Sequence, residues 1–256
     1  ALEPEVMQQV AAELKHSEPV FVEQGEDGLH LRYFTPAGEV DLCGHATVAT
    51  FALLRRLGRI GDGTHTAHTR AGKLDIGVSG ETVWMDRAPP TTLGVLPEES
   101  WAELYGAYGL TLADRPEGLE PEIVSTGLAD IMMPVTDHET LMRAKQNEET
   151  VTALSKHFDV TGVHMFCLGE DKVYCSNFAP LYDIPEECAT GTSNGALTYY
   201  LYERGLVEPG KENLFLQGEH MGRPSRIYSR LTAEDGAVRV RIGGQAVLSL
   251  SGEMDL

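Results

Sequence analysis

The chain of 256 residues carries 39 acidic against 20 basic side chains, a formal charge of −19, with 42% hydrophobic and 23% charged residues. This composition is that of a globular protein long enough for two lobes, and its acidic balance opposes binding to nucleic acid or to an anionic membrane surface. No run of about eighteen apolar residues could cross a bilayer, and acidic side chains interrupt the N-terminus where a signal peptide is apolar, so we expect a cytoplasmic protein.

The hydrophobic pattern changes between helical and strand-like periods along the chain. It predicts a helix over 5–14, a turn at 16–18, strands over 19–23 and 29–34, and an apolar helix over 44–58. The elements expected after it are strands over 66–71, 73–78, 82–87, 123–126 and 131–135, a helix over 151–157, strands over 163–168 and 172–179, a second apolar helix over 191–205, and a hairpin of 236–242 with 245–251.

A stretch rich in Pro, Glu and Asp, 112–122, is the candidate crossover between two lobes. An N-terminal lobe would then cover residues 1–116 and be completed by the last residues of the chain. A C-terminal lobe would cover 117–256. Each lobe holds one of the two apolar helices.

The two apolar helices repeat one pattern. Fourteen positions separate Gly44 from Gly58, and fourteen separate Gly191 from Gly205, with small polar residues at each start. Such residues suit a helix N-terminus, and the closing glycines suit left-handed C-terminal caps. Because a helix that is apolar on nearly every face is buried, the repeat predicts two similar halves, each with strands wrapped around one helix. We expect the N–H groups at the two helix starts to bind a small carboxylated ligand between the halves.

The chain has four cysteines without CxxC spacing, which predicts reduced thiols. They are Cys43, Cys167, Cys175 and Cys188. His65 and His68 form an HxxH pair with no evident third ligand, so we expect exposed histidines and no metal site.

Ordered motifs cover most of the chain. They are Phe34–Pro36 with Glu39, Cys43–Thr47, Ser176–Pro180, Pro185–Thr192, and Gln217–Gly218 with Met221–Ser225. Together they resemble the signatures of PhzF-type isomerases, the phenazine biosynthesis-like proteins. The resemblance implies an α+β fold of the diaminopimelate epimerase type, with two similar lobes, each a mixed β-sheet curled around a central α-helix, and an active site in the cleft between them. It also implies cofactor-independent isomerase activity and a homodimer.

The candidate catalytic residues are Glu18, His45 and Glu187. A carboxyl group between electropositive helix ends can carry a proton to and from carbon, and Glu18 lies in a segment that resembles the one with the family's catalytic glutamate. The alternative is an ordinary surface acid. His45 opens the first repeat helix and matches a histidine that lines the family's active site. Glu187 stands where the family commonly has aspartate, and we expect it to hold a substrate amine or hydroxyl or, alternatively, only to offset the helix dipole.

The candidate substrate-binding residues are glycines and small polar residues at the helix starts, together with one arginine. They are Gly44, Thr190, Gly191, Thr192, Ser193, Gly218 and Arg223. Thr192 stands where serine is common in the family, and it could bind a carboxylate beside the N–H groups of its neighbours or only cap its helix. Arg223 could supply positive charge to an acidic substrate or only brace a sheet end.

Two other functions stay open. Epimerases of this fold use two opposed thiols, and Cys43 stands at the first of these places, but Thr190 occupies the second and a hydroxyl is too weak an acid to replace a thiolate. The second alternative is a binding protein that keeps the cleft without turnover. One departure is that the family normally begins with a strand and a Gly-Asn-Pro-type turn ahead of the first helix, whereas this sequence opens in that helix; a first lobe without that strand would have a weakened sheet.

Overall fold

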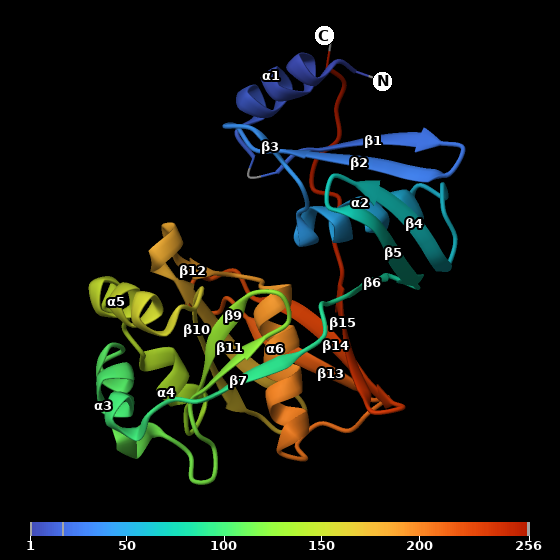
Figure 1. Cartoon of the computed structure of the whole chain (residues 1–256). Helices are drawn as coiled ribbons and strands as arrows, with labels where there is room; N and C mark the ends of the chain where they lie inside the picture. Colours follow the sequence, from blue (N-terminus) through green and yellow to red (C-terminus); the bar gives the residue numbers. More distant parts are fainter. Residues whose placement is uncertain (1, 17, 255–256) are drawn as a thin grey trace. The chain divides into compact units, whose positions relative to one another are not determined.

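The computed structural model describes residues 2–16 and 18–254, which form two compact units (Figure 1). Unit 1 comprises residues 1–86 and 243–256, and unit 2 comprises 87–242. The turn predicted at 16–18 includes Ser17, which lies outside the described residues. None of the described helices is both long and apolar enough to span a membrane.

Unit 1 is a curled sheet around one helix. Its elements are α1 (Pro4–Leu14), β1 (Val20–Gly25), β2 (Gly28–Phe34), β3 (Glu39–Val40), α2 (Gly44–Arg56), β4 (Gly63–Thr69), β5 (Gly72–Ser79) and β6 (Thr82–Asp86). The strand order is β1-β2-β4-β5-β6, with β3 on β2 and a parallel β2–β4 pair. Helix α2 contacts β1 at one end of this order and both β5 and β6 at the other, so the sheet curls around the helix.

The C-terminal segment returns to unit 1. A Cβ on Gly243 would lie 2.9 Å from the Trp84 ring, and one on Gly244 would lie 3.2 Å from Val48. Gln245 donates to the Thr82 hydroxyl at 3.3 Å. These close approaches pack the last part of the chain against β6 and α2, and the structure thus places the final residues with the N-terminal unit.

Unit 2 is a larger curled sheet. Its elements are β7 (Thr91–Val95), α3 (Glu98–Gly106), η1 (Leu112–Asp114), β8 (Glu122–Ser125), β9 (Ala129–Pro134), α4 (His138–Arg143), α5 (Glu148–Phe158), β10 (Gly162–Leu168), β11 (Val173–Ala179), η2 (Pro180–Tyr182), β12 (Ile184–Glu187), α6 (Gly191–Glu203), β13 (Glu212–Gln217), β14 (Ser225–Glu234) and β15 (Ala237–Gly244). The strand order is β15-β14-β13-β11-β10-β9-β8-β7, with β12 on β11. Helix α6 contacts β14 near one end and β8 and β9 near the other, and Figure 1 shows it among these strands.

The central strands of unit 2 are buried on both faces. On β9, Met132 packs into the cluster around α6, whereas Ile131 and Met133 pack into a second cluster with side chains of α3, α4 and α5. Buried strands of this kind have continuous apolar runs rather than alternation. The helix α6 is therefore enclosed, and its buried residues run from Ser193 to Thr198 and include Tyr200 and Leu201. In contrast, α2 buries one face and leaves Leu53 39% exposed.

The predicted repeat of the two helices is confirmed, including the way they end. Gly58 and Gly205 have φ angles of +67° and +69°. In α2, Gly58 N–H donates to the Arg55 carbonyl and Arg59 N–H to the Leu54 carbonyl, both at 3.0 Å. The same pair of bonds closes α6, from residues 205 and 206 to residues 202 and 201, both at 2.9 Å. Both helices thus end in a Schellman motif.

Two features differ from the expectations. The structure divides the chain between Asp86 and Arg87, whereas the predicted boundary at 116/117 falls inside unit 2, because β7 pairs with β8 and thereby holds 91–95 in that unit. The predicted closing hairpin of 236–242 with 245–251 is wrong. Asp235 and Gly236, with φ angles of +50° and +78°, instead form the turn between β14 and β15, as an Asp-Gly pair favours.

Replacing Gly205 by alanine is expected to lower the free energy of unfolding by about 1–2 kcal/mol, because a Cβ disfavours the left-handed backbone. Space is not the limit, since nothing lies within 4 Å of a Cβ built there. Gly106→Ala is the matched control. Gly106, the last residue of helix α3, has equal space for a Cβ, but its φ angle is not positive. Urea unfolding of both variants checks the prediction, and an equal effect of the two changes contradicts it.

Candidate functional site

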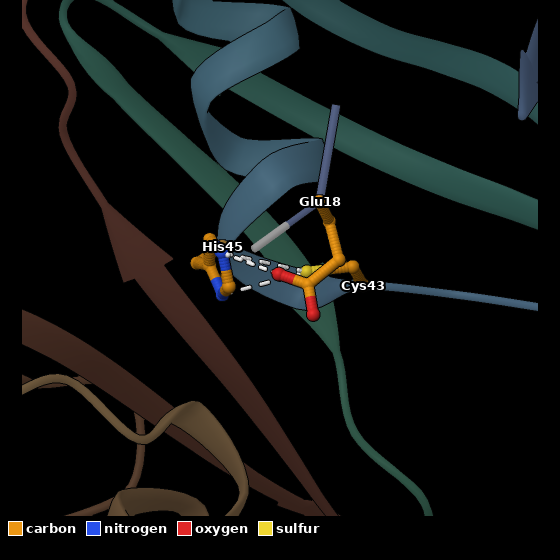
Figure 2. Close-up of side chains that lie close together, drawn as sticks. All are labelled: Glu18, Cys43 and His45. Carbon is orange, nitrogen blue, oxygen red and sulfur yellow. Dashed lines mark hydrogen bonds and ion pairs between the residues drawn. The ribbon is translucent and has the colours of Figure 1, made fainter. Parts of the chain in front are cut away.

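Three side chains converge at the start of α2 in unit 1 (Figure 2). Glu18 stands between α1 and β1, Cys43 is the residue before α2, and His45 is the second residue of the helix. The Glu18 Oε2 atom lies 3.1 Å from His45 Nε2, and Cys43 Sγ lies 3.4 Å from His45 Nδ1. The Glu18 side chain is 22% exposed and that of His45 is 58% exposed. A half-buried carboxylate therefore faces an accessible imidazole.

The contact between Glu18 Oε2 and His45 Nε2 is within ion-pair distance but lacks the geometry of a well-aligned hydrogen bond. Glu18 Oε2 is enclosed, and among the described residues no hydrogen bond with good geometry reaches it. An enclosed carboxylate oxygen without a donor is costly, and a ligand that supplies one would relieve this.

The Cys43 thiol is held in its neutral form. Burial, together with the neighbouring Glu18 carboxylate, raises the pKa of this thiol to about 12, while the backbone N–H groups of Ala46 and His45 oppose the rise. Because the thiolate is the reactive form, Cys43 is a poor base near neutral pH.

In unit 2, a second group of predicted residues gathers at the start of α6. The Thr190 hydroxyl donates to Glu187 Oε2 at 2.7 Å, and the Gln217 amide donates to the Thr190 hydroxyl at 3.0 Å. The first backbone bond of α6 runs from Asn194 N–H to the Thr190 carbonyl. The N–H groups of Gly191, Thr192 and Ser193 consequently have no partner within the helix, as expected at a helix start.

A buried polar layer lies beneath this helix start. The Ser193 hydroxyl donates to Asp130 Oδ2 at 2.6 Å, and burial raises the pKa of Asp130 to about 6. His164 is fully buried, its Nδ1 lies 2.9 Å from Asn177 Oδ1, and burial lowers its pKa to about 4. Near neutral pH the imidazole is thus neutral. Because the Ser193 side chain faces inward, only its backbone N–H remains for a ligand.

The other predicted residues divide between the two units. Gly44 begins α2 and Gly191 begins α6. Gly218 has a φ of +89°, and a Cβ there would lie 2.6 Å from the Arg223 carbonyl, so the expected close approach of the backbone is present. Arg223 is exposed, and within the described part of the chain its guanidinium donates no hydrogen bond. Thr192 is not the residue that caps α6, since Thr190 holds that position.

Two residues at the start of α6 were missing from the predicted site. Gln217 is fully buried and bonds to several groups there, and its place in the Gln217–Gly218 motif was the available signal. Arg87 has a lowered pKa through burial, and its Nη1 lies 4.0 Å from a Cβ built on Gly191. Arg87 is the last residue of the strand predicted over 82–87, and no motif in the sequence marked it as a site residue.

A further cluster lies on the surface of unit 1. Asp27 Oδ1 is 2.8 Å from His30 Nε2, and Asp27 Oδ2 is 3.4 Å from His68 Nε2. The two imidazole rings stack at 4.8 Å with 13° between their planes. His68 Nε2 also lies 3.1 Å from the Asp27 carbonyl oxygen, so Asp27 engages one histidine through its carboxylate and the other through both its backbone and its carboxylate. His68 lies on strand β4, in agreement with the strand predicted over 66–71, and both His65 and His68 are partly buried rather than exposed as expected.

Comparison with known proteins identifies the relatives of this chain. The family model described as PhzC-PhzF, phenazine biosynthesis-like protein, matches residues 1–252. A Deinococcus radiodurans protein named "Uncharacterized isomerase" is 34% identical over 97% of this chain and 84% of its own length. The trans-2,3-dihydro-3-hydroxyanthranilate isomerase of Pseudomonas fluorescens is 27% identical over 96% of this chain and 87% of its own length.

Solved structures agree with these relatives. The PhzF-family phenazine biosynthesis protein of Bacillus anthracis superposes with a TM-score of 0.84 at 27% identity, covering 95% of this chain and 86% of that one. A hydroxyproline epimerase from Agrobacterium vitis, with a TM-score of 0.53 at 15% identity, covers 95% of this chain and 77% of its own and shares the fold alone. The architecture is thus that of an isomerase with the epimerase-like α+β fold. Within that class, the chain belongs to the phenazine biosynthesis-like PhzC-PhzF family.

The buried layer predicts a pH effect for Asp130→Asn. The usual pKa of aspartate is 3.8 and that of folded Asp130 is about 6, so ionisation of Asp130 destabilises the fold as the pH rises through this range. His164 acts in the opposite sense, because its pKa is 6.5 when unfolded and about 4 when folded, and stability is lost as the pH falls. Removing Asp130 therefore leaves the His164 effect unopposed.

We expect the stability of Asp130→Asn relative to wild type to rise by about 3 kcal/mol from below pH 4 to about pH 7.5, at about 1.4 kcal/mol per pKa unit. Denaturant unfolding at several pH values measures this change. If the amide lowers the free energy of unfolding by the same amount at every pH, the predicted difference between low and high pH stays the same. Asp183→Asn, at an exposed position, is the control. Parallel pH profiles of wild type and Asp130→Asn would contradict the prediction.

Proposed function

We propose that this isomerase moves a proton between carbon atoms of a small carboxylate-bearing metabolite without a cofactor, with Glu18 as the proton carrier. The observation that carries this proposal is the Glu18 carboxylate, which is only 22% exposed and lies 3.1 Å from His45 Nε2 at the start of α2. A carboxylate removed from bulk water and set beside an imidazole is suited to general acid–base chemistry.

In this reaction, a substrate C–H bond breaks and its proton passes to a carboxylate oxygen of Glu18. The electron pair moves into the substrate's π system. The proton held by Glu18 exchanges with solvent, and the carboxyl then delivers a proton to a different carbon, so that no net proton or redox partner is needed. His45 holds Glu18 Oε2 and, being 58% exposed, can turn to meet the substrate. The positive end of α2 favours the negative charge that develops.

The start of α6 is proposed to bind the substrate. The free N–H groups of Gly191, Thr192 and Ser193 form a helix terminus that favours a carboxylate, and Arg87 adds positive charge nearby. Glu187 is proposed to accept a hydrogen bond from a substrate amine or hydroxyl. The named substrate of the Pseudomonas fluorescens relative has a carboxylate, an amine and a hydroxyl, and we propose an anion with such a donor here.

Substituting Glu18 by glutamine tests the proposal. Thermal shift is used to screen anionic metabolites, including aromatic and amino acids, against wild type and Glu18→Gln, and each binder is then incubated in deuterated water. We expect wild type to convert the substrate and to incorporate deuterium at carbon, and the variant to bind it with turnover reduced by at least about 10²-fold, the usual share of a general base.

Glu26→Gln is the matched control, because Glu26 lies exposed in the β1–β2 turn of the same unit. Full turnover by Glu18→Gln would contradict the assignment of Glu18. Binding of the anions without turnover by wild type would contradict isomerisation of those compounds.

Cys43→Ala separates this reaction from two-base epimerisation. A thiol with a pKa of about 12 is protonated near neutral pH, and the Thr190 hydroxyl at the matching place already donates to Glu187. We therefore expect Cys43→Ala to keep turnover within about an order of magnitude of wild type, whereas loss of a thiol base would cost at least about 10²-fold. Rates measured beside Cys167→Ala, a buried thiol of unit 2, separate this from a loss of folded protein.

A further inference from the structure

The Gln217 side chain is fixed in one orientation by backbone groups. It is fully buried, its Nε2 donates to the Glu187 carbonyl at 2.7 Å, and its Oε1 accepts from Thr190 N–H at 3.3 Å. A carbonyl can only accept and an N–H can only donate, so the reversed amide would face like groups on both sides. Asn194, which donates its amide to the Thr190 carbonyl at 2.9 Å, adds a second bond to Gln217 Oε1 at 2.7 Å.

This orientation fixes the direction of the Thr190 hydroxyl. Gln217 Nε2 donates to Thr190 Oγ1 at 3.0 Å, so the hydroxyl acts as an acceptor on that side. A threonine hydroxyl has a single proton, and the atom on its other side is Glu187 Oε2 at 2.7 Å. The hydrogen bonds therefore run in one direction, from Gln217 through Thr190 to Glu187.

This series of hydrogen bonds also gives different roles to the two carboxylate oxygens of Glu187. Oε2 accepts the Thr190 proton, whereas among the described residues Oε1 accepts no hydrogen bond. The side chain is partly exposed at the end of β12. One oxygen is thus anchored and the other is left to a ligand that donates.

We infer that Gln217 and Thr190 are positioning residues that orient the Glu187 carboxylate, so that Oε1 alone faces the substrate's donor group. This assigns Thr190 an indirect role in place of the direct substrate contact predicted from its motif. The inference rests on the proposed function of Glu187 in binding substrate, but it does not depend on the role of Glu18.

Two substitutions at Thr190 separate orientation from folding. Thr190→Val keeps the shape and removes the hydroxyl, while Thr190→Ser keeps the hydroxyl and removes a methyl group. The matched control is Thr198→Val on the same helix. Thr198 is fully buried and its hydroxyl bonds to the Asn194 carbonyl at 2.7 Å and to Ser229 Oγ at 2.8 Å, away from Glu187.

The first measurement needs no substrate. In ¹³C-labelled protein, the carboxylate ¹³Cδ resonance of Glu187 is expected to shift in Thr190→Val and to stay near the wild-type value in Thr190→Ser and Thr198→Val. An unchanged resonance in Thr190→Val, or equal shifts in the two Thr190 variants, would overturn the inference. This result stands whether or not Glu18 carries the proton.

The second measurement uses the substrate found by the deuterium screen. A misplaced group costs up to about 10²-fold, so we expect Thr190→Val to lower kcat by about one to two orders of magnitude, with a smaller rise in KM. Thr190→Ser should recover most of the rate, and Thr198→Val should retain it despite a similar loss of melting temperature. A rate in Thr190→Val that equals that of Thr198→Val would overturn the positioning role. Loss of turnover in Thr190→Val while Glu18→Gln stays active would contradict the proton carrier and support the positioning residues.

Discussion

The first backbone N–H groups of a helix cannot bond within that helix, and this constraint shapes both candidate sites. The chain meets it differently at its two repeat helices. At α2, the N–H groups of His45 and Ala46 interact with the Cys43 thiol, beside the Glu18–His45 pair. At α6, Gln217 accepts from one N–H ahead of the helix and three further N–H groups stay open. The open N–H groups of α6 are the ones that we propose to bind the substrate carboxylate.

In unit 2, polar groups at the start of the repeat helix are buried, whereas in unit 1 the corresponding helix start is more exposed. The helix α6 is buried on almost every side, so the polar side chains of its first turn need hydrogen-bond partners from the protein. Asp130 accepts from Ser193, and Gln217 accepts from Asn194. The opposed pKa changes of Asp130 and His164 arise from the same burial, since each group is most stable in its neutral form there. The bonds of Ser193 to Asp130 and of Asn194 to Gln217 hold this arrangement of the helix start.

Sequence periodicity predicted the repeated helices, their closing glycines and most strands, because each of these depends on local chemistry. The α+β fold and the family also followed from motifs. Helices α3 and α4 and strands β3, β7 and β12–β14 were missed. Most of these segments are short, although β14 has ten residues, and the strands are held by a sheet that is assembled from distant residues. The unit boundary was misplaced for the same reason: 112–122 is polar and Pro-rich, yet the pairing of β7 with β8 determines to which unit it belongs. Of the candidate site, the motifs indicated Glu18, His45, Glu187 and Thr190 as single residues. They did not indicate the contacts between them or the directed bonds of Gln217, which depend on how the strands lie against the helix starts.

The return of the C-terminal segment to unit 1 has a consequence for synthesis on the ribosome. Unit 2 is one continuous stretch, 87–242. Unit 1 consists of two separate stretches, and the second one, through residues 243 and 244, packs against Trp84 and Val48 of the first. The enclosed helix α6 and its polar layer can therefore be assembled while the other unit still lacks its last segment. The unit with the Glu18 carboxylate is therefore the later one to be completed: a chain that stops after residue 242 contains all of unit 2 but lacks the segment that packs against Trp84 and Val48.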